Sequence, residues 1–581
     1  MKRNLLLLIF LLFSTSMFAQ SIRGKITDGN KEVVAGATVI VEGTNVASIT
    51  DALGNYTLNN LKPGKYKIKV SLLGYRTVFK VVELGTQNAT FNFSVAEESK
   101  NLQDVVVVGY GTKLRREVTG SIASLNAKEL NDLPVPSFES ALQGKLPGVQ
   151  VTTGSGIAGS AAVIRIRGIA SISAGGDPLY VIDGIPITQD YFLRGNSGAA
   201  NNNPLAAINP DDIESIDILK DAAANAIYGS RGSNGVVLIT TKRAKKGTNV
   251  SYTGSVGTSQ PTALPNMLNN EQFLQLYQEA YENDGGVGLA PLPNNISWDD
   301  ARKTNTDWVD LTTRTGIKHS HNVGVSRGGK NFSILGNISY GKNESFLVGN
   351  SYDRTSFRIN GDARPTKDLK LGFSTSLSSG INNRVNTAWA GGLGSAMSTA
   401  LPIFPVYNPD GTFFTGGDNP VRTQELKKWR SQEYRSINGI NAEYLINDRL
   451  SVNANANLDY MTINDDEYSP KELILSNHAG SANRNEVNTR NYNYFFQLNY
   501  DVKLPVGHKL KAMGGYEFQK SRSFFRNKFA NGMTGGFYEP DAKVDDSLYT
   551  YNESLTTSNE WKFNSYFTRL SYSYNNKLFL E

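Results

Sequence analysis

The stretch Leu450-Ser-Val-Asn-Ala-Asn-Ala-Asn-Leu-Asp-Tyr460 alternates apolar or aromatic residues with Ser, Asn and Asp. Because successive side chains of a strand point to opposite faces, this alternation predicts one apolar and one polar face. Lipid outside and water inside a membrane barrel would suit the two faces. The strands of a soluble β-sandwich alternate in the same way, so this stretch alone leaves both architectures open.

The lengths of the connections between candidate strands separate the two architectures. Brief turns are predicted at residues 328–331, 364–368, 447–449, 503–508 and 575–577. Much longer connections are predicted at residues 342–353, 380–436, 462–490 and 520–561. Short and long connections alternate strictly, as periplasmic turns and extracellular loops do in outer-membrane barrels. Residues 246–581 are therefore predicted to form a transmembrane antiparallel β-barrel with extracellular loops.

The first barrel strand is expected near residues 249–257, before an outer excursion over residues 258–318 with a helix at residues 271–282. This interpretation gives about eleven strands, whereas plugged transporters of this kind have about 22. Half a barrel leaves two open edges, whose unpaired backbone groups are costly in hydrocarbon. We therefore expect that about half of the barrel is present in this sequence.

The beginning of the chain has the order of a secretory signal peptide. Lys2 and Arg3 precede the apolar residues 5–13, and Ala19 closes a short polar stretch. The apolar run is too short for a helix that spans a membrane. Residues 1–19 are therefore predicted to be a signal peptide, and the protein is predicted to be exported to the outer membrane.

Composition narrows the chemistry that is possible. The chain has no cysteine, which excludes disulfides, Cys-based zinc sites and thiol catalysis. Its 59 basic and 53 acidic residues are spread throughout, so the net charge of +6 predicts a solvated surface and no nucleic-acid partner. A mean hydropathy of -0.34 does not fit a helical membrane protein.

Residues 20–96 are predicted to form a small β-sandwich. Apolar residues recur at a two-residue period in residues 37–42, 55–58 and 66–72, with glycines between them. The most distinctive segments are Gly24-Lys-Ile-Thr-Asp28, Gly36-Ala-Thr-Val39, Thr50-Asp-Ala-Leu-Gly-Asn-Tyr56 and Leu61-Lys-Pro-Gly64. These segments resemble the transthyretin-like regulatory domain that accompanies carboxypeptidases, which is not the catalytic domain.

No constellation of catalytic residues stands out in the rest of the sequence. None of the four histidines has a glutamate within three positions, so the spacing of a zinc peptidase is missing: His319, His321, His478 and His508. His319 and His321 share one face of a predicted strand, but without a third ligand they are expected to be ordinary barrel residues. We expect no enzyme activity, no metal and no cofactor.

A run of four valines lies in a predicted linker, residues 97–112, as Asp104-Val-Val-Val-Val-Gly-Tyr-Gly111. Because β-branched residues favour extended backbone, the run predicts a strand. The strand could be an ordinary buried one. It could also be kept free to pair with the sheet edge of another protein, since such pairing is made by the main chain.

Two downstream motifs favour the second interpretation. The first is Asp177-Pro-Leu-Tyr-Val-Ile-Asp-Gly-Ile-Pro-Ile187. The second runs from Ile208 to Lys242 and contains Tyr228-Gly-Ser-Arg-Gly-Ser-Asn-Gly235. Together with the valine run, these motifs closely resemble the SusC/RagA family of TonB-dependent outer-membrane transporters. The resemblance spans almost the whole chain.

The resemblance implies that the protein is mainly β and that residues 113–245 form an α+β plug domain inside the barrel. It implies a TonB box made of Asp104, Val105, Val106, Val107, Val108 and Gly109. It implies a plug motif made of Pro178, Leu179, Tyr180, Val181, Ile182, Asp183, Gly184, Tyr228, Gly229, Arg231, Gly232, Asn234 and Gly235. We expect the plug-motif residues to be plug architecture rather than ligand contacts.

Local patterns agree with a plug. Val163-Ile-Arg-Ile-Arg-Gly168 alternates as a strand does, and Asp183-Gly184 fits a turn after a strand. Asn209-Pro210 fits an N-cap and a first helical residue, so a short helix should start there. The glycine spacing in Gly154-Ser-Gly-Ile-Ala-Gly159 matches a dinucleotide-binding fingerprint, but a strand follows it, so we expect a plug loop.

By this resemblance the protein imports a large nutrient, a glycan or a peptide, through a plugged barrel. A SusD-like surface lipoprotein would capture the cargo and close over the lumen. TonB with its proton-driven inner-membrane complex would supply the energy, and outer-membrane lipids would surround the barrel. The cargo contacts stay unassigned, since Trp389 and Trp429 fit an interfacial girdle as well as stacking on sugar rings.

Three other functions are open at this point. One is a TonB-dependent receptor for a siderophore or another small ligand, without a lipoprotein cap. Another is a receptor that also signals through an anti-sigma factor, which needs an extra N-terminal domain for which residues 95–105 leave no room. The third is a secreted β-rich adhesin, which should have strands shorter than a membrane crossing and no accessible valine strand.

Overall fold

The computed structural model describes residues 20–28, 32–72, 75, 77–95, 105–108, 111–114, 117–118, 120–130, 137–153, 155–169, 176–187, 203–221, 225–387, 392–474, 480–544 and 549–581. Residues 1–19, Asp104, Gly109, Gly154, Trp389 and His478 lie outside the described residues. The chain divides into two compact units, residues 1–105 and 106–581. The prediction that the fold is mainly β is confirmed.

The first unit contains a small β-sandwich. Its strands are β1 (Gln20–Thr27), β2 (Thr38–Val41), β3 (Ala47–Ile49), β4 (Asn55–Leu61), β5 (Gly64–Ser71), β6 (Val78–Leu84), β7 (Ala89–Thr90) and β8 (Phe93–Ser94). One sheet has the order β4-β1-β7, with β8 also on β1, and the other has the order β3-β2-β5-β6. Ile22, Leu58 and Ile68 are fully buried among the apolar residues of the two sheets. The sandwich therefore closes a core of its own.

The second unit begins with a short β-pair and an α+β domain, here called the plug. Its strands are β9 (Val105–Val108), β10 (Gly111–Leu114), β11 (Ile122–Asn126), β12 (Val149–Thr153), β13 (Ala162–Ile166), β14 (Leu179–Ile182), β15 (Ile185–Pro186), β16 (Ile213–Leu219) and β17 (Val236–Thr241). Its helices are α2 (Ala127–Leu130), α3 (Phe138–Ala141), η2 (Pro204–Ala207), η3 (Pro210–Asp212) and η4 (Ala226–Gly232). The central sheet has the order β11-β16-β17-β14-β15, and β12 pairs with β13.

The plug sequence explains its local structure. The predicted strand at residues 163–168 is β13, and β14 turns into β15 through Asp183 and Gly184, which have φ values of 48° and 85°. The short helix predicted after Asn209 is a single 3₁₀ turn, η3, because β16 begins immediately afterwards. The Asn209 side chain caps this turn by accepting a hydrogen bond from the Asp211 amide.

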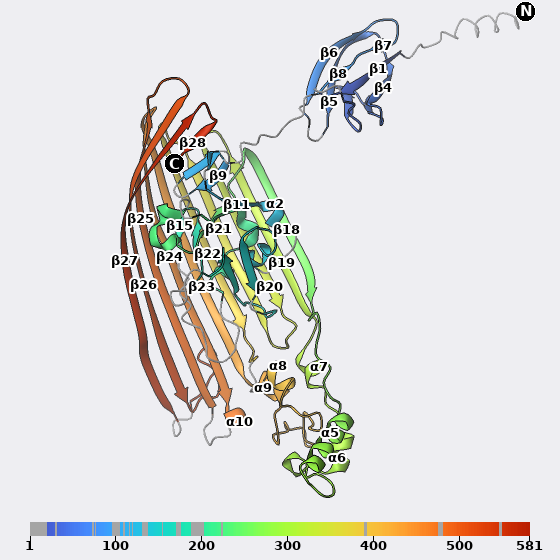
Figure 1. Ribbon diagram of the computed structural model, residues 1–581, viewed down its shortest axis with the longest axis vertical. Helices are drawn as coiled ribbons and strands as arrows, with labels where there is room; N and C mark the ends of the chain where they lie inside the picture. Colours follow the sequence, from blue (N-terminus) through green and yellow to red (C-terminus); the bar gives the residue numbers. More distant parts are fainter. Residues whose placement is uncertain are drawn as a thin grey trace, which may run out of the picture. The chain divides into compact units, whose positions relative to one another are not determined.

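The rest of the second unit is an eleven-stranded antiparallel sheet, here called the wall. Its strands are β18 (Gly247–Ser259), β19 (Gly316–Gly328), β20 (Phe332–Glu344), β21 (Ser351–Ala363), β22 (Leu369–Asn383), β23 (Lys428–Asn447), β24 (Leu450–Pro470), β25 (Gly480–Val502), β26 (His508–Asn531), β27 (Thr550–Tyr574) and β28 (Leu578–Leu580). Strands adjacent in sequence are adjacent in the sheet throughout. Figure 1 shows one curved sheet with plug elements on its inner side.

The five predicted turns of the wall are present, but its long connections are shorter than predicted. The observed connections cover residues 345–350, 384–427, 471–479 and 532–549, instead of 342–353, 380–436, 462–490 and 520–561. The strands continue where the apolar alternation weakens, so β24 to β27 have 21 to 25 residues. Backbone pairing between neighbours, such as Asn464 with Glu486, extends the strands through these stretches, where Ile463 and Val487 also pack together.

The two faces of the wall differ as the alternation predicts. Outward side chains such as Ile338, Phe373 and Phe496 are large, apolar and exposed. Inward side chains are polar and buried. Arg358, for example, contacts the plug, and Asn493 contacts Glu517 of the neighbouring strand. This division fits the lipid-facing and lumen-facing sides of an outer-membrane barrel.

Two long connections of the wall pack together into a helical subdomain. The first contains α5 (Asn270–Asn283), η5 (Pro293–Asn295), α6 (Trp298–Lys303) and α7 (Trp308–Thr312), and the second contains α8 (Leu393–Ala396) and α9 (Pro420–Leu426). The helix predicted at residues 271–282 is α5, which Asn269 and Gln272 begin with a capping box. Another short helix, α10 (Lys471–Ile474), follows β24. Among the described helices, none has both the length and the apolar composition needed to cross a membrane.

Candidate functional site

The four valines predicted to couple to TonB form strand β9. Among the described residues β9 pairs along one edge with β10, and together they form a two-stranded sheet. The sequence had suggested a strand kept free for another protein. In the structure one of its two edges is already paired. Only two residues separate β9 from β10, a spacing typical of hairpins, so the valines have a partner within the chain. The described sheet has no strand on the other edge of β9, which leaves that edge open to a second partner.

Asp183 of the plug motif fastens the plug to the wall. Its carboxylate accepts hydrogen bonds from the Thr241 amide at 2.9 Å and the Thr241 hydroxyl at 2.6 Å. Arg358 of β21 donates to the same carboxylate at 2.7 Å, and both charged side chains are at least 94% buried. The ion pair is nearly closed to water. Removing either Asp183 or Arg358 would therefore leave the charge of the other buried and uncompensated.

Arg231 of the plug motif makes a second ion pair with the wall. Its Nη2 atom lies 2.5 Å from Oε2 of Glu517 in β26, and its Nη1 atom contacts the Gln519 amide oxygen. Glu517 also accepts a hydrogen bond from Asn493 of β25 at 2.5 Å. Arg231, in the glycine-rich turn of the motif, thus contacts one of the last strands of the wall. Its partner Glu517 is 286 residues away in sequence.

The other plug-motif residues shape the plug itself. Leu179, Tyr180, Val181 and Ile182 form β14, which Pro178 precedes, and β14 pairs in parallel with β17. Tyr228 and Gly232 are buried in η4, where Gly229 has a φ of 60°, and Asn234 donates to the Asp177 carbonyl. At Gly235, with a φ of 90°, a Cβ atom would lie 2.6 Å from Ile166. Gly229 and Gly235 therefore have backbone conformations that favour glycine, and Tyr228 packs inside the plug.

Further hydrogen bonds join the plug and the wall. Asn360 of β21 donates to the Thr241 hydroxyl and the Lys242 carbonyl. Asn337 of β20 donates to Asp212 at 2.8 Å, and Asn491 of β25 donates to the Pro186 carbonyl at 2.8 Å. Sequence reasoning did not single out these wall residues. Their one signal is that polar or charged residues recur on the inward face of strands whose outward face is apolar.

The contact between plug and wall is polar, whereas the plug interior is apolar. The plug's main cluster of buried apolar residues includes one wall side chain, Ile437, among the described residues. A neutral hydrogen bond of this contact contributes about 0.5–1.5 kcal/mol, whereas breaking the buried Asp183–Arg358 pair from one side costs more. The plug therefore closes an apolar core of its own and meets the wall mainly through polar side chains.

His319 and His321 make aromatic and hydroxyl contacts with their neighbours. Among the described residues, no group of three His, Asp or Glu side chains could hold a metal ion. His321 instead contacts the Tyr252 hydroxyl through Nδ1 at 2.8 Å, and the His319 ring lies against the Tyr340 ring. These contacts are made by residues whose strand register places them on the outward face of the wall.

Glu139 of α3 provides a test of how the plug depends on pH. Burial raises the pKa of its carboxyl group, although Asn203 donates a hydrogen bond to Oε1 at 3.0 Å. A raised pKa in the folded state means that folded plug binds this proton more tightly, so plug stability falls as pH rises through the folded pKa. Glu139→Gln is expected to stabilise the plug at pH 7, by removing the charge while keeping an acceptor for Asn203.

This stabilisation should shrink as pH falls below about 4, the ordinary pKa range of a Glu carboxyl, because the Glu139 carboxyl then becomes protonated in the folded and the unfolded protein alike. The measurement is the urea midpoint at which the plug becomes sensitive to protease while the wall stays resistant. A Glu139→Gln variant that is equally or less stable at pH 7 would contradict the raised pKa of this carboxyl group.

Comparison with known proteins agrees with this organisation. Residues 115–236 match the TonB-dependent Receptor Plug Domain, and residues 22–107 match the CarboxypepD_reg-like domain. TonB-dependent receptor P26 of Formosa agariphila is 32% identical over 97% of this chain and 56% of its own length. TonB-dependent receptor SusC of Bacteroides thetaiotaomicron is 30% identical over 99% of this chain and 57% of its own length.

A solved structure has the same fold. The RagAB peptide importer in its open-open state matches with a TM-score of 0.69 at 22% identity, over 81% of this chain and 55% of that one. The chain spans about half the length of the curated relatives it matches. Those relatives are receptors and importers by name. In sequence, domain order and fold, this chain is similar, over that half, to the SusC-like TonB-dependent receptors.

Proposed function

We propose that this protein is an outer-membrane importer that carries a glycan or a peptide through a plugged β-barrel and is driven by TonB. The observation that carries the proposal is the order of three features: a valine strand that pairs along one edge alone among the described residues, a plug, and a wall that holds the plug by polar contacts. Force applied to the strand would reach the plug directly, because few residues lie between β10 and β11.

The proposal includes export by residues 1–19 and a TonB box at residues 104–109. TonB would add a strand to the open edge of β9, because pairing through the main chain tolerates variation in side chains. A SusD-like surface lipoprotein would close the lumen over the cargo. We propose no catalytic step, no cofactor and no nucleic-acid partner.

Val106→Pro in the complete protein tests the coupling strand. Proline removes an amide hydrogen and does not fit an interior strand position, so strand addition by TonB should fail. We expect growth on the cargo as sole nutrient to be lost, while the barrel still assembles in the outer membrane. The matched control Val106→Thr keeps a β-branched residue and its amide, and should import normally. Unchanged growth of the Pro variant would remove the coupling assignment.

A pull-down from detergent-extracted outer membranes separates this function from its alternatives. A surface lipoprotein that co-purifies in equal amount supports the capped importer. Recovery from the membrane without such a partner favours a receptor for a siderophore or another small ligand. Recovery in the soluble fraction alone would favour a secreted adhesin and would contradict the barrel.

A further inference from the structure

The outward face of the wall changes from apolar to basic along β25 and β26, which are neighbours in the sheet (Figure 1). On β25 the outward positions are apolar or aromatic over residues 492–500, and the next outward residue is Arg490. On β26 they are apolar or aromatic over residues 510–518, and Lys520 and Arg522 follow. A strand crosses a membrane in about 9–11 residues. The basic side chains therefore begin where the lipid-facing belt ends.

Arg490 and Arg522 point away from the lumen. The neighbour of Arg490, Asn491, donates a hydrogen bond to the plug at 2.8 Å. The neighbours of Arg522, Ser521 and Ser523, are buried. Because successive side chains of a strand point to opposite faces, both arginines lie on the outward face of the wall, where both are exposed.

The two arginines lie on the extracellular side of the apolar belt. A short turn over residues 503–507 joins β25 to β26 at the end of these strands that carries the belt. The longer connections, residues 471–479 and 532–549, leave from the opposite ends of the same strands. In outer-membrane barrels short turns are periplasmic and longer loops are extracellular. In the proposed importer, both arginines are therefore at the level of the headgroups of the outer leaflet.

Arg490 and Arg522 are directly opposite each other on the two strands. Residues in this relation have Cβ atoms about 4.5–5.5 Å apart, and like charges there destabilise a sheet. No residue that the structure describes forms an ion pair or a side-chain hydrogen bond with either guanidinium group. Arg490 instead lies over the Tyr460 ring, 5.8 Å from its centroid. The described part of the chain thus supplies no anion to offset the two charges.

The carboxylate across from Arg522 already has other partners. Glu560 of β27 is opposite Arg522 in the register, but its carboxylate lies 3.5 Å from Lys520 Nζ and 3.3 Å from Lys562 Nζ. These two lysines are also directly opposite each other. We call Arg490, Lys520, Arg522 and Lys562 the basic cluster. Among the described residues, its four cations have one acidic partner, Glu560.

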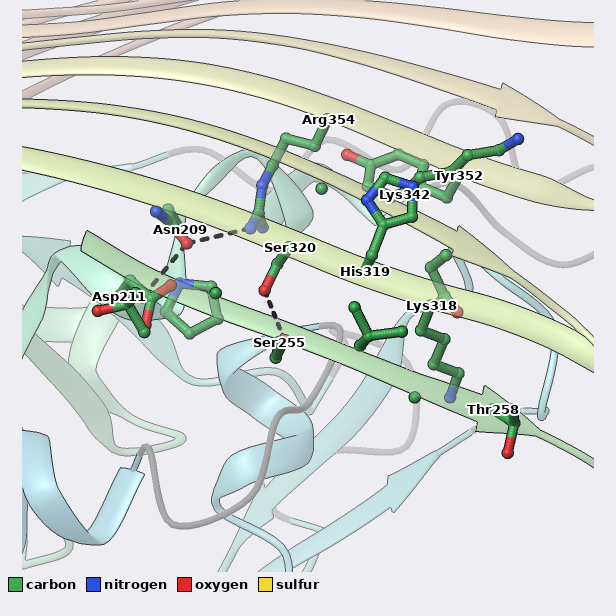
Figure 2. A pocket seen from close by; sticks show the side chains of 17 residues that line it. Asn209, Asp211, Ser255, Thr258, Lys318, His319, Ser320, Lys342, Tyr352 and Arg354 are labelled. Atoms are coloured by element: carbon green, nitrogen blue, oxygen red, sulfur yellow. Dashed lines mark hydrogen bonds between the residues drawn. The ribbon is translucent and has the colours of Figure 1, made fainter.

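Two other arginines of the wall show the contrast. Arg526 lies on the same outward face of β26, further from the belt, and pairs with Glu553 at 3.2 Å. On the inward face, Figure 2 shows Arg354 turned towards Asn209, whose side chain accepts its hydrogen bond at 3.1 Å. Both arginines have an acceptor within the chain, whereas no described residue supplies one to the pair at the end of the belt.

We propose that Arg490 and Arg522 bind the phosphate group of lipid A, the glycolipid that anchors lipopolysaccharide in the outer leaflet of an outer membrane. Guanidinium groups bind phosphate oxygens by paired, charge-assisted hydrogen bonds, so one phosphate bridges the two arginines and removes their repulsion. Lys520 and Lys562 add positive charge beside the phosphate.

The apolar belt next to the basic cluster favours a lipid over a free phosphate ion. A lipid A molecule with its phosphate at Arg490 and Arg522 lays its acyl chains along residues 492–500 and 510–518, so one ligand covers both surfaces. Tyr460 lies beside Arg490, as aromatic side chains do at the membrane interfaces of barrels. The inference rests on the proposed place of the barrel in the outer membrane, but not on TonB or on the cargo.

Native mass spectrometry of the purified complete protein in detergent tests the site. The probe is monophosphoryl lipid A, and the matched counterpart is the same lipid after enzymatic removal of its phosphate. We expect the phosphorylated lipid to bind with a dissociation constant about tenfold or more below that of its counterpart, as charge-assisted hydrogen bonds provide. Inorganic phosphate is the third probe and should bind more weakly than the lipid, because it makes no contact with the belt.

Arg490→Gln is the main variant, and it should raise the dissociation constant for the phosphorylated lipid about tenfold. The barrel should stay intact, because Arg490 is exposed and has no ion-pair partner among the described residues. Arg526→Gln is the matched control. It removes the same charge from the same face of the wall, but from a residue that already pairs with Glu553, and should leave lipid binding unchanged.

Arg490→Glu gives a second measurement that does not depend on lipid. This substitution places a carboxylate opposite Arg522, so the melting temperature of the lipid-free protein should rise. Binding of lipid A should be lost in the same variant. Because a misfolded barrel would melt at a lower temperature, loss of binding together with a raised melting temperature excludes misfolding as its cause.

Four results would overturn the inference: no saturable binding of lipid A, equal binding with and without its phosphate, unchanged binding by Arg490→Gln, or an equal loss of binding in Arg526→Gln. Inorganic phosphate that binds as tightly as the lipid would overturn the choice of a lipid. The titration needs no TonB, so its failure together with loss of growth in Val106→Pro would leave the proposed function in place. Lipid binding together with normal growth of Val106→Pro would instead leave the lipid site and remove the TonB coupling.

Discussion

Arg358→Ala is expected to release the plug from the wall at a cost of about 3–5 kcal/mol, the usual result of breaking a buried ion pair from one side. The variant leaves the Asp183 carboxylate buried, with the amide and hydroxyl of Thr241 still donating to it. The plug should then become sensitive to protease at a much lower urea concentration, while the wall stays resistant. A double variant with Asp183→Ala should recover part of the loss, because it removes the uncompensated charge.

Lys370→Ala gives the matched control for this prediction. Lys370 and Glu443 also form an ion pair, at 3.8 Å, but their side chains are 42% and 39% exposed. Exposed pairs contribute about 0–1 kcal/mol, so the urea midpoint should barely move. If Arg358→Ala behaved like Lys370→Ala, the Asp183 contact would not be what holds this part of the plug.

Gly24→Ala is expected to unfold the N-terminal sandwich. A Cβ atom at this position would lie 1.8 Å from the Phe91 carbonyl oxygen and 2.9 Å from the Tyr56 ring. The same oxygen accepts a hydrogen bond from the Tyr56 hydroxyl at 2.7 Å, so the methyl group would force apart both a backbone contact and that bond. Overpacking and the lost bond together predict a loss of about 3 kcal/mol or more, which is a large part of a small domain's stability.

Limited proteolysis of the whole protein measures this effect, since the sandwich should be digested while the plug and wall remain. Gly85→Ala is the matched control, because a Cβ atom there meets no atom within 4 Å. Survival of the sandwich in Gly24→Ala would show that β1 can move away from residue 91 at little cost.

Sequence patterns predicted the parts of this fold that depend on neighbouring residues. The two-residue alternation placed the strands of the wall and the brief turns between them, and Asn269 with Gln272 marked the start of α5. The strand ends were predicted poorly, because β24 to β27 continue through largely polar stretches that backbone pairing with the neighbouring strand keeps extended. The pairing of β9 with β10 was missed for a related reason, since valines alone do not reveal their partner.

The contacts between plug and wall could not be predicted from local patterns. Asp183 and Arg358 are 175 residues apart, and no pattern within one strand reveals such a partner. The inward positions of Arg354 and Arg358 in an alternating strand do signal that each needs a partner in the lumen. Which oxygen atom of the plug accepts hydrogen bonds from each arginine depends on the strand register of the whole wall.

The short pairing of β9 with β10 also determines what gives way first under load. Each of these strands has four residues, whereas the wall strands from β18 to β27 have 13 or more. Elements loaded in series yield in order of strength, and the least stable unit of a protein opens before the rest. In the proposed importer, we therefore expect a pull on residues 104–109 to open the short β9–β10 pair before it breaks the contacts between plug and wall or any strand pairing of the wall.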